Sequence, residues 1–175
     1  EDDSLFATYD VGGGIAFGTS STLSNIHSHY TITAYDAADG FVLTGRMRMS
    51  SFKSGIGVTF LSDYPFSDRY YRLRRYNGNA FHLAPHGTKV AGDTDSGVVP
   101  ATNTWYLFKI LVQDTGSRIE IKANVWEQDT EEPADWQIDA YDDSADRLTT
   151  GKIGVWSYSL GSKYWDDIKV ELLGP

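Results

Sequence analysis

Apolar and polar residues alternate with a period of two along much of this chain, which is typical of strands with one buried face. In residues 41–49, FVLTGRMRM, one face is apolar and the other carries Arg46 and Arg48. No segment of similar length has the period of an amphipathic helix. The alternation predicts strands over residues 5–9, 30–34, 41–49, 55–61, 70–75, 80–83, 104–113, 118–126, 136–140, 153–157 and 167–172.

Turn motifs separate these segments, among them Asp39-Gly40, Asn77-Gly78 and His86-Gly87. Many short strands with regular turns predict an all-β fold, a two-sheet antiparallel β-sandwich or jelly roll. A length of 175 residues suits a single domain, 1–175. The sequence has no initiator Met and no signal-peptide pattern, so we expect a domain excised from a larger protein.

Composition narrows the possible partners. The net charge of −9 argues against binding to nucleic acid. No cysteine is present, which excludes disulfides and thiolate metal sites. No apolar run is long enough for membrane insertion. Aromatic residues make up 14% of the chain, and Tyr and Trp in excess of core needs often mark binding surfaces.

Four segments carry a family resemblance. They are FVLTGRMRM with GIGVTFL, YYRLRRYNGNAFHL at 70–83, the stretch from Trp105 to Trp136, and GKIGVW with YWDDIKV within 151–170. These segments resemble the concanavalin A-like lectin and glucanase sandwiches, in their LamG-like carbohydrate-binding branch, whereas the N-terminal forty residues match only loosely. The resemblance implies two stacked antiparallel sheets, sugar binding and a secreted or cell-surface location. An excised domain is also expected to be tethered to other domains.

The preferred hypothesis is a non-catalytic module that binds a polysaccharide, and an acidic polysaccharide is one candidate. Sugar rings stack on aromatic side chains, and charged side chains bond to hydroxyl, carboxylate or sulfate groups. We expect the four arginines among the candidate ligand-binding residues below to share one face of the sandwich. Alternatively, they could pair with Asp and Glu across strands. The candidate ligand-binding residues are Arg46, Arg48, Tyr64, Tyr70, Arg72, Arg74, Tyr76, His82, Trp156, Tyr158 and Trp165.

Two enzyme hypotheses compete, and neither assigns a catalytic residue. Glu127, Asp129 and Glu132 have the E-x-D-x-x-E spacing of family 16 glycoside hydrolases, which share this fold. The string follows a strand and runs into Pro133, so we interpret it as a solvated acidic turn. A polysaccharide lyase needs a Tyr or His base and a cation for the uronate carboxylate, and residues 70–82 contain both types. A structural or adhesion domain of a surface or phage particle is the third possibility.

Two smaller features have alternative interpretations. His27 and His29 would lie on one face of an extended segment, but two ligands are too few for a tight metal site, so we interpret them as polar loop residues. Asp166 falls on the inward parity of Ile168 and precedes the last strand. It could share a structural calcium with Asp3, if the termini are adjacent, or cap backbone amides.

Overall fold

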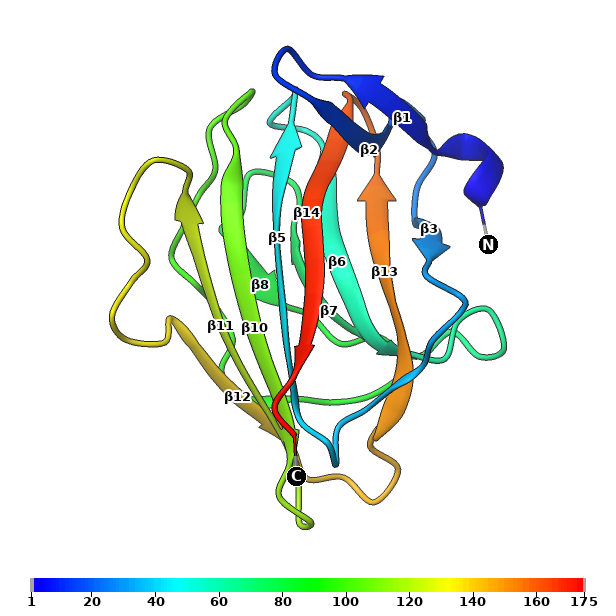
Figure 1. Cartoon of the computed structure of the whole chain (residues 1–175), viewed down its shortest axis with the longest axis vertical. Coiled ribbons are helices and arrows are strands. Elements are labelled where there is room, and N and C mark those ends of the chain that lie inside the picture. Colours follow the sequence, from blue (N-terminus) through cyan, green and yellow to red (C-terminus); the bar gives the residue numbers. More distant parts are fainter. Residues whose placement is uncertain (1, 175) are drawn as a thin grey trace.

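The computed structural model describes residues 2–174 and shows two antiparallel sheets packed face to face (Figure 1). Among these residues the sole helix is a short 3-10 turn, η1 (Asp3–Leu5). The eight-stranded sheet has the order β1 (Ala7–Asp10), β2 (Ile15–Thr19), β14 (Lys163–Leu172), β5 (Phe41–Met49), β10 (Tyr106–Asp114), β11 (Ile119–Glu127), β12 (Ile138–Asp142) and β9 (Ala91–Asp93). The six-stranded sheet has the order β3 (Ile26–His29), β13 (Thr150–Tyr158), β6 (Gly55–Ser62), β7 (Tyr71–Arg75) and β8 (His82–Leu83), and β4 (Tyr35–Asp36) pairs with β13.

The predicted all-β sandwich is confirmed, and most predicted strands are present within a few residues. The turns Asp39-Gly40, Asn77-Gly78 and His86-Gly87 each contain a glycine with positive φ, a conformation that glycine adopts without strain. The strand predicted over residues 30–34 is absent. Its apolar residue Ile32 is 82% exposed, and strands β3 and β4 lie on either side of this segment instead. No helix of the described residues is long and apolar enough to cross a membrane.

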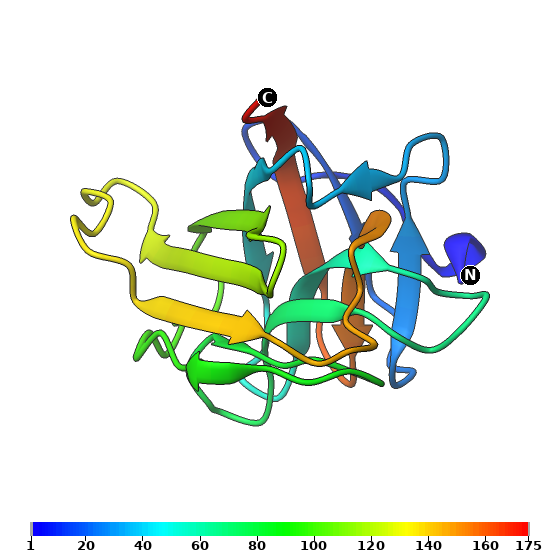
Figure 2. The ribbon, with the colours of Figure 1, turned by 90° about the horizontal axis from the view of Figure 1, so that it is seen from below.

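The core lies between the sheets and is built from their inward-facing rows. Burial alternates strictly along β5, where the apolar residues that begin with Phe41 and Leu43 are fully buried. Each such side chain contributes roughly 1.5–3 kcal/mol on burial. Figure 2 shows the two layers from below. Trp165 of β14 is also in the core, and its indole N–H donates to the Gly57 carbonyl across the sandwich at 3.0 Å. Trp165 is therefore a core residue, and its predicted contact with a ligand stays a prediction without structural support.

An irregularity in β14 changes which way its residues point. The register with β5 shifts between Asp166 and Lys169, and Asp167 has a φ of 55°. This β-bulge reverses the alternation. Asp166, predicted to point inward, instead lies with Arg46 on the outer surface. A period-two pattern cannot reveal this, because the extra residue is visible only once the partner strand is known.

The first residue of β14, Lys163, is completely buried. Its ammonium donates to the carbonyl oxygens of Ser21, Ser159 and Gly161 at 2.8, 2.7 and 2.8 Å. Burial lowers the pKa of Lys163 to about 8, so the group is still protonated at neutral pH. One charged side chain thus joins the loop before β3 to the turn between β13 and β14.

Candidate functional site

The four candidate arginines lie on opposite surfaces of the sandwich. Arg46 and Arg48 are on β5 of the eight-stranded sheet, whereas Arg72 and Arg74 are on β7 of the six-stranded sheet. All four occupy the positions that alternate with core residues. The prediction of a single shared face is wrong, because alternation places a residue relative to its own sheet and does not say which sheet a strand joins.

The arginines of the eight-stranded sheet already have protein partners. Arg46 pairs with Asp166 at 2.7 Å and with Asp167 at 3.0 Å, and it donates to Gln128 at 3.0 Å. Its guanidinium also lies 4.9 Å from the centre of the Trp105 ring. Arg48 lies over the same ring at 4.8 Å. This surface fits the alternative interpretation, in which arginines pair with acids and aromatic rings of the protein itself.

The outer surface of the six-stranded sheet, here called the β7–β13 face, is different. The register aligns His27, Trp156, Gly57, Arg74 and His82 in one row across β3, β13, β6, β7 and β8. The glycine in the middle leaves room for the indole to reach over β6 toward β7. A Cβ added at Gly55, on the same side of β6, would lie only 2.9 Å from the Trp156 ring.

Aromatic rings and guanidinium groups alternate on this face. The order is Tyr70, Arg72, Trp156, Arg74 and Tyr76, which we call the arginine ladder. The Arg72 guanidinium is 5.3 Å from the centre of the Tyr70 ring and 4.3 Å from the centre of the Trp156 ring. The Arg74 guanidinium is 5.4 Å from the Trp156 ring and 4.3 Å from the Tyr76 ring. Ring faces attract cations, so the ladder fixes both arginines in place.

Among residues 2–174, buried polar atoms without a hydrogen-bond partner concentrate here. They include His27 Nδ1, the Tyr70 hydroxyl, Arg72 Nε and Nη1, and Arg74 Nε. Within residues 2–174, no carboxylate lies within 4.0 Å of either ladder arginine. Arg72 is only 3% exposed. A buried polar group that lacks a partner costs about 1–3 kcal/mol, and a charged one costs more.

The pKa values of this face follow from burial. Burial, helped by the charge of Arg74, lowers the pKa of Arg72 to about 10. Burial and the neighbouring His29 lower the pKa of His27 to about 3, so this imidazole is neutral at pH 7. Burial raises the pKa of Tyr70 to about 12, so its phenol stays protonated. The arginines are therefore the permanent charges among these groups.

The more exposed rings lie around the ladder. Tyr64 stacks on His27 with ring centres 4.6 Å apart, and Tyr158 stacks on Trp156 at 6.0 Å. Tyr64, Tyr76 and Tyr158 are partly exposed, whereas Trp156 is buried beneath its neighbours. The structure therefore leaves the tyrosines as surfaces for stacking, and Trp156 as the support beneath the arginines.

The histidines show what sequence reasoning missed. His27 and His29, interpreted as loop residues, are buried on β3, with rings stacked 5.7 Å apart. The signal was present, since they have period-two spacing and follow the apolar Ile26. The ring centres of His82 and Tyr76 are 6.3 Å apart. His86 stacks on Tyr70 with ring centres 5.2 Å apart, and its Nε2 lies 3.0 Å from a carboxylate oxygen of Asp68.

The acidic string of the hydrolase hypothesis lies at the end of β11, on the other sheet from the arginine ladder. Glu127 ends the strand, and Asp129 sits in a turn with a φ of 70°. Glu132 pairs with Lys109 at 3.0 Å. The three carboxylates do not project from one rigid strand, which agrees with their interpretation as a solvated turn.

The two aspartates of the calcium hypothesis have other partners. Asp3 accepts a hydrogen bond from the Ser28 hydroxyl at 2.6 Å, and Asp166 pairs with Arg46. No group of three or more His, Asp or Glu side chains suited to a metal occurs among residues 2–174. These side chains do not fit a calcium site, and calcium binding remains a prediction without structural support.

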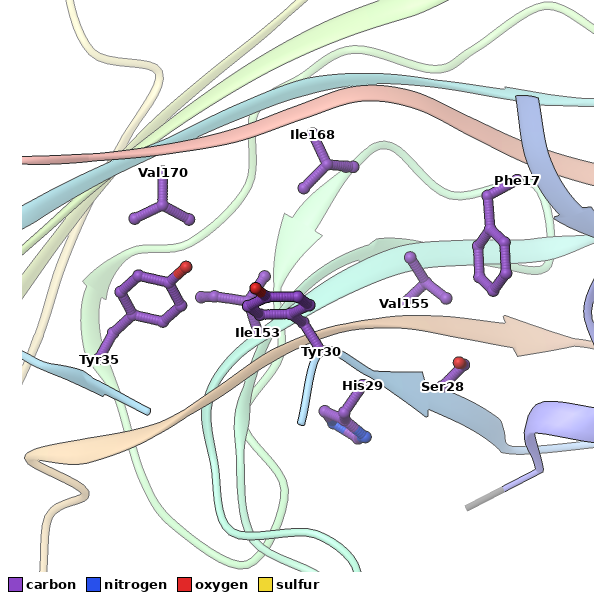
Figure 3. Close-up of a pocket in the computed structure, with 9 residues that line it drawn as sticks. All are labelled: Phe17, Ser28, His29, Tyr30, Tyr35, Ile153, Val155, Ile168 and Val170. Carbon is purple, nitrogen blue, oxygen red and sulfur yellow. The ribbon is translucent and has the colours of Figure 1, made fainter. Parts of the chain in front are cut away.

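A pocket of about 510 Å³ opens at the edge of the sandwich, between β13 and β14. Figure 3 shows Ile168 and Val170 of β14 on one side and Ile153 and Val155 of β13 on the other, with the rings of Tyr30 and Tyr35 beside them. These aliphatic residues belong to the inward rows of the two sheets. The pocket is therefore an open margin of the core, and among residues 2–174 no Asp, Glu, Lys or Arg side chain lines it.

Comparison with known proteins identifies the fold. No protein-family model and no curated protein sequence matches the chain. Among solved structures, the carbohydrate-binding module CBM66 from Bacillus subtilis aligns with a TM-score of 0.64 at 13% identity, over 95% of this chain and 91% of the module. A putative glycosyl hydrolase from Parabacteroides distasonis aligns with a TM-score of 0.60 at 14% identity, over 99% and 92% of the two chains. The catalytic domain of a glycoside hydrolase family 131 protein from Coprinopsis cinerea gives 0.52 at 7% identity, over 90% and 70%.

Proposed function

We propose that this chain, a jelly-roll β-sandwich of the concanavalin A-like kind, binds a polysaccharide on its β7–β13 face. The observation that carries the proposal is the arginine ladder, whose charged groups are held between aromatic rings without protein hydrogen-bond partners at several nitrogens. The structural neighbours include both a carbohydrate-binding module and glycoside hydrolase domains, so the fold is compatible with binding and with catalysis.

The face has the two kinds of group that sugars need. The partly exposed rings of Tyr64, Tyr76 and Tyr158 offer flat surfaces for the C–H faces of pyranose rings. The guanidinium of Arg74, which is half-buried, offers donors to sugar oxygens. A surface site with few contacts per sugar gives modest affinity, which suits a module that recruits a tethered, extracellular partner domain to its substrate.

Affinity electrophoresis through gels that contain neutral, uronic or sulfated polysaccharides tests the proposal. We expect retardation on at least one polymer, and a loss of about tenfold in affinity for Tyr76→Ala, on the scale of the ~1–3 kcal/mol that stacking on one aromatic ring contributes for a nucleobase. Tyr164→Ala is the matched control, because Tyr164 lies on the eight-stranded sheet beside Arg48. No retardation on any polymer would overturn the proposal.

A second candidate function is that of a polysaccharide lyase, which is favoured by the proximity of a histidine, a tyrosine and an arginine on this face. Neutral His27 lies 5.0 Å, ring to ring, from Tyr70, which borders the Arg72 guanidinium. In such a reaction the cation neutralises a uronate carboxylate, and the neutral imidazole takes the proton from the adjacent ring carbon. The bond from the next carbon to the glycosidic oxygen then breaks, a C=C bond forms, and the phenol protonates the leaving oxygen.

Burial argues for binding over this catalytic role. His27 and Tyr70 are at most 1% exposed, so substrate reaches them only if the rings above move aside. Ultraviolet absorbance of unsaturated uronate products decides between the two. We expect no product from alginate, polygalacturonate or hyaluronan. Turnover by the wild-type protein that is lost in Tyr70→Phe, with Tyr164→Phe unaffected, would replace binding by catalysis as the function.

A further inference from the structure

We propose that the β7–β13 face selects glycans with an anionic oxygen group, a carboxylate or a sulfate, and that Arg74 binds this group at the surface while the buried charge of Arg72 beside it adds to the attraction. The inference rests on the proposed function and narrows its ligand class. It starts from a charge that the protein buries without compensation.

The first argument is the burial of Arg72 without partners. Its side chain is more than nine-tenths buried, and two of its three guanidinium nitrogens are inaccessible and unpaired. Rings on two sides offset part of the cost, because the ring quadrupole attracts a cation. A ring face does not accept directed N–H hydrogen bonds as a carboxylate does. Part of the free-energy cost of removing the guanidinium from water is therefore not offset.

The second argument is the contrast with the opposite sheet. The chain has 24 Asp and Glu residues against 15 Lys and Arg, so acidic partners are abundant. Arg46 uses them, with one aspartate at 2.7 Å and another at 3.0 Å. The two ladder arginines have none within 4.0 Å among residues 2–174. Arg48 on the opposite sheet also lacks a carboxylate within 4.0 Å among these residues, but it is partly exposed to water, whereas Arg72 is buried. A buried arginine without a close counter-ion marks the ladder as a place where an external anion is the missing partner.

The third argument is the set of donors around the arginines. Arg74 Nε is also unpaired among residues 2–174, and the Arg74 guanidinium can donate to oxygen. Arg74 is half-buried and reaches the surface, while the Arg72 charge beside it is shielded from water and so is poorly screened. A neutral hydroxyl can accept one such bond but leaves two positive charges uncompensated. An anionic group satisfies donors and charge together.

Matched polymer pairs test the inference by affinity electrophoresis and calorimetry. The carboxylate arm compares polygalacturonate, alginate and hyaluronan, each with its own methyl ester, which keeps the backbone and removes the charge. The sulfate arm compares dextran sulfate with dextran. We expect at least one charged polymer to bind about tenfold or more tightly than its neutral form. The arm in which this occurs identifies the anion.

Variants attribute the preference to the ladder. Arg72→Gln and Arg74→Gln should each reduce the charged-to-neutral affinity ratio at least fivefold, whereas Arg48→Gln, with the same change in net charge on the opposite sheet, should leave it unchanged. Circular dichroism checks that each variant is folded. If the buried Arg72→Gln change prevents folding, Arg74→Gln still tests the inference, because Arg74 is only half-buried. Equal binding to charged and neutral forms, with ratios unaffected by both variants, overturns the inference while sugar binding stands. No binding to any polymer overturns both.

Discussion

At the scale of single residues, two arginines of β7 are similarly buried but differ in whether they have hydrogen-bond partners. Arg72 and Arg75 are both almost fully buried. Arg75 points into the protein and donates to the carbonyls of Ser54 at 3.0 Å and Asn79 at 3.3 Å. Arg72 has two buried nitrogens without a partner. The same residue type on the same strand is therefore hydrogen-bonded within the protein at one position and an uncompensated buried charge at the other.

This contrast predicts opposite effects on stability. Arg72→Met should raise the free energy of unfolding by about 1–3 kcal/mol, because it removes an uncompensated buried charge and keeps the packing volume. Arg75→Met should lower it by about 2 kcal/mol, because it leaves carbonyl groups without donors. Urea unfolding of the three proteins measures both. A similar loss of stability in both variants would show that Arg72 is a structural residue.

His27 predicts how stability depends on pH. Its folded pKa of about 3 is below the unfolded value of 6.5, so the unfolded state binds more protons between these values. Stability contributed by neutral His27 is complete above pH 6.5 and is lost as the pH falls toward 3, by at most about 1.4 kcal/mol per pH unit. His27→Gln should reduce this slope.

The control for this experiment lies on the same face. Tyr158 stacks on Trp156 there, and Tyr158→Phe, which changes no carboxylate or imidazole, should leave the slope between pH 6.5 and 4.5 close to that of the wild type. The range stops at pH 4.5 because carboxylates dominate titration below it. Equal slopes for wild type and His27→Gln would contradict the burial of a neutral imidazole at this position.

At the scale of elements, strand pairing decides what the side chains can do. Trp156 of β13 reaches Arg72 and Arg74 of β7 only because β6, which lies between them, carries glycines at positions 55 and 57 on that side. The sequence GIGV shows the glycines, and period two shows that they share a face. Which aromatic residue fills the space above them follows from the order of the strands, which pairs residues far apart in the chain.

Lys163 supplies a prediction at this scale. Lys163→Met should lower the free energy of unfolding by about 3 kcal/mol or more, because three backbone carbonyls lose a charged donor. Limited proteolysis should also cut the loop that contains Ser21 faster in this variant. Lys169→Met is the control, since its ammonium is exposed and its ion-pair partner among residues 2–174 is Glu171. Unchanged stability in Lys163→Met would exclude this role.

At the scale of the whole molecule, the overall charge opposes the local charge of the site. The protein carries a net charge of −9, while the arginine ladder is positive. An approaching polyanion is repelled at long range and attracted only near the ladder. Salt shortens the Debye length from about 30 Å at 0.01 M to about 8 Å at 0.15 M, and thus weakens the long-range term first.

We therefore expect the association rate constant for an anionic glycan to increase between about 0.01 and 0.15 M salt. Surface plasmon resonance on an immobilised uronic polymer measures this rate. A basic patch on a neutral or cationic protein shows the reverse trend. A rate constant that falls steadily with salt would mean that the ladder dominates the field even at long range.

The sequence by itself determined the all-β class, most strands, the turns and the outward rows that contain Arg46, Arg48, Arg72 and Arg74. These features depend on local periodicity and turn chemistry, which a linear pattern carries in full. Only the tertiary structure separated the two arginine pairs, turned Asp166 outward and buried Trp165. Each of these outcomes depends on which strands pair and in which register, and distant segments settle that by packing together around the core.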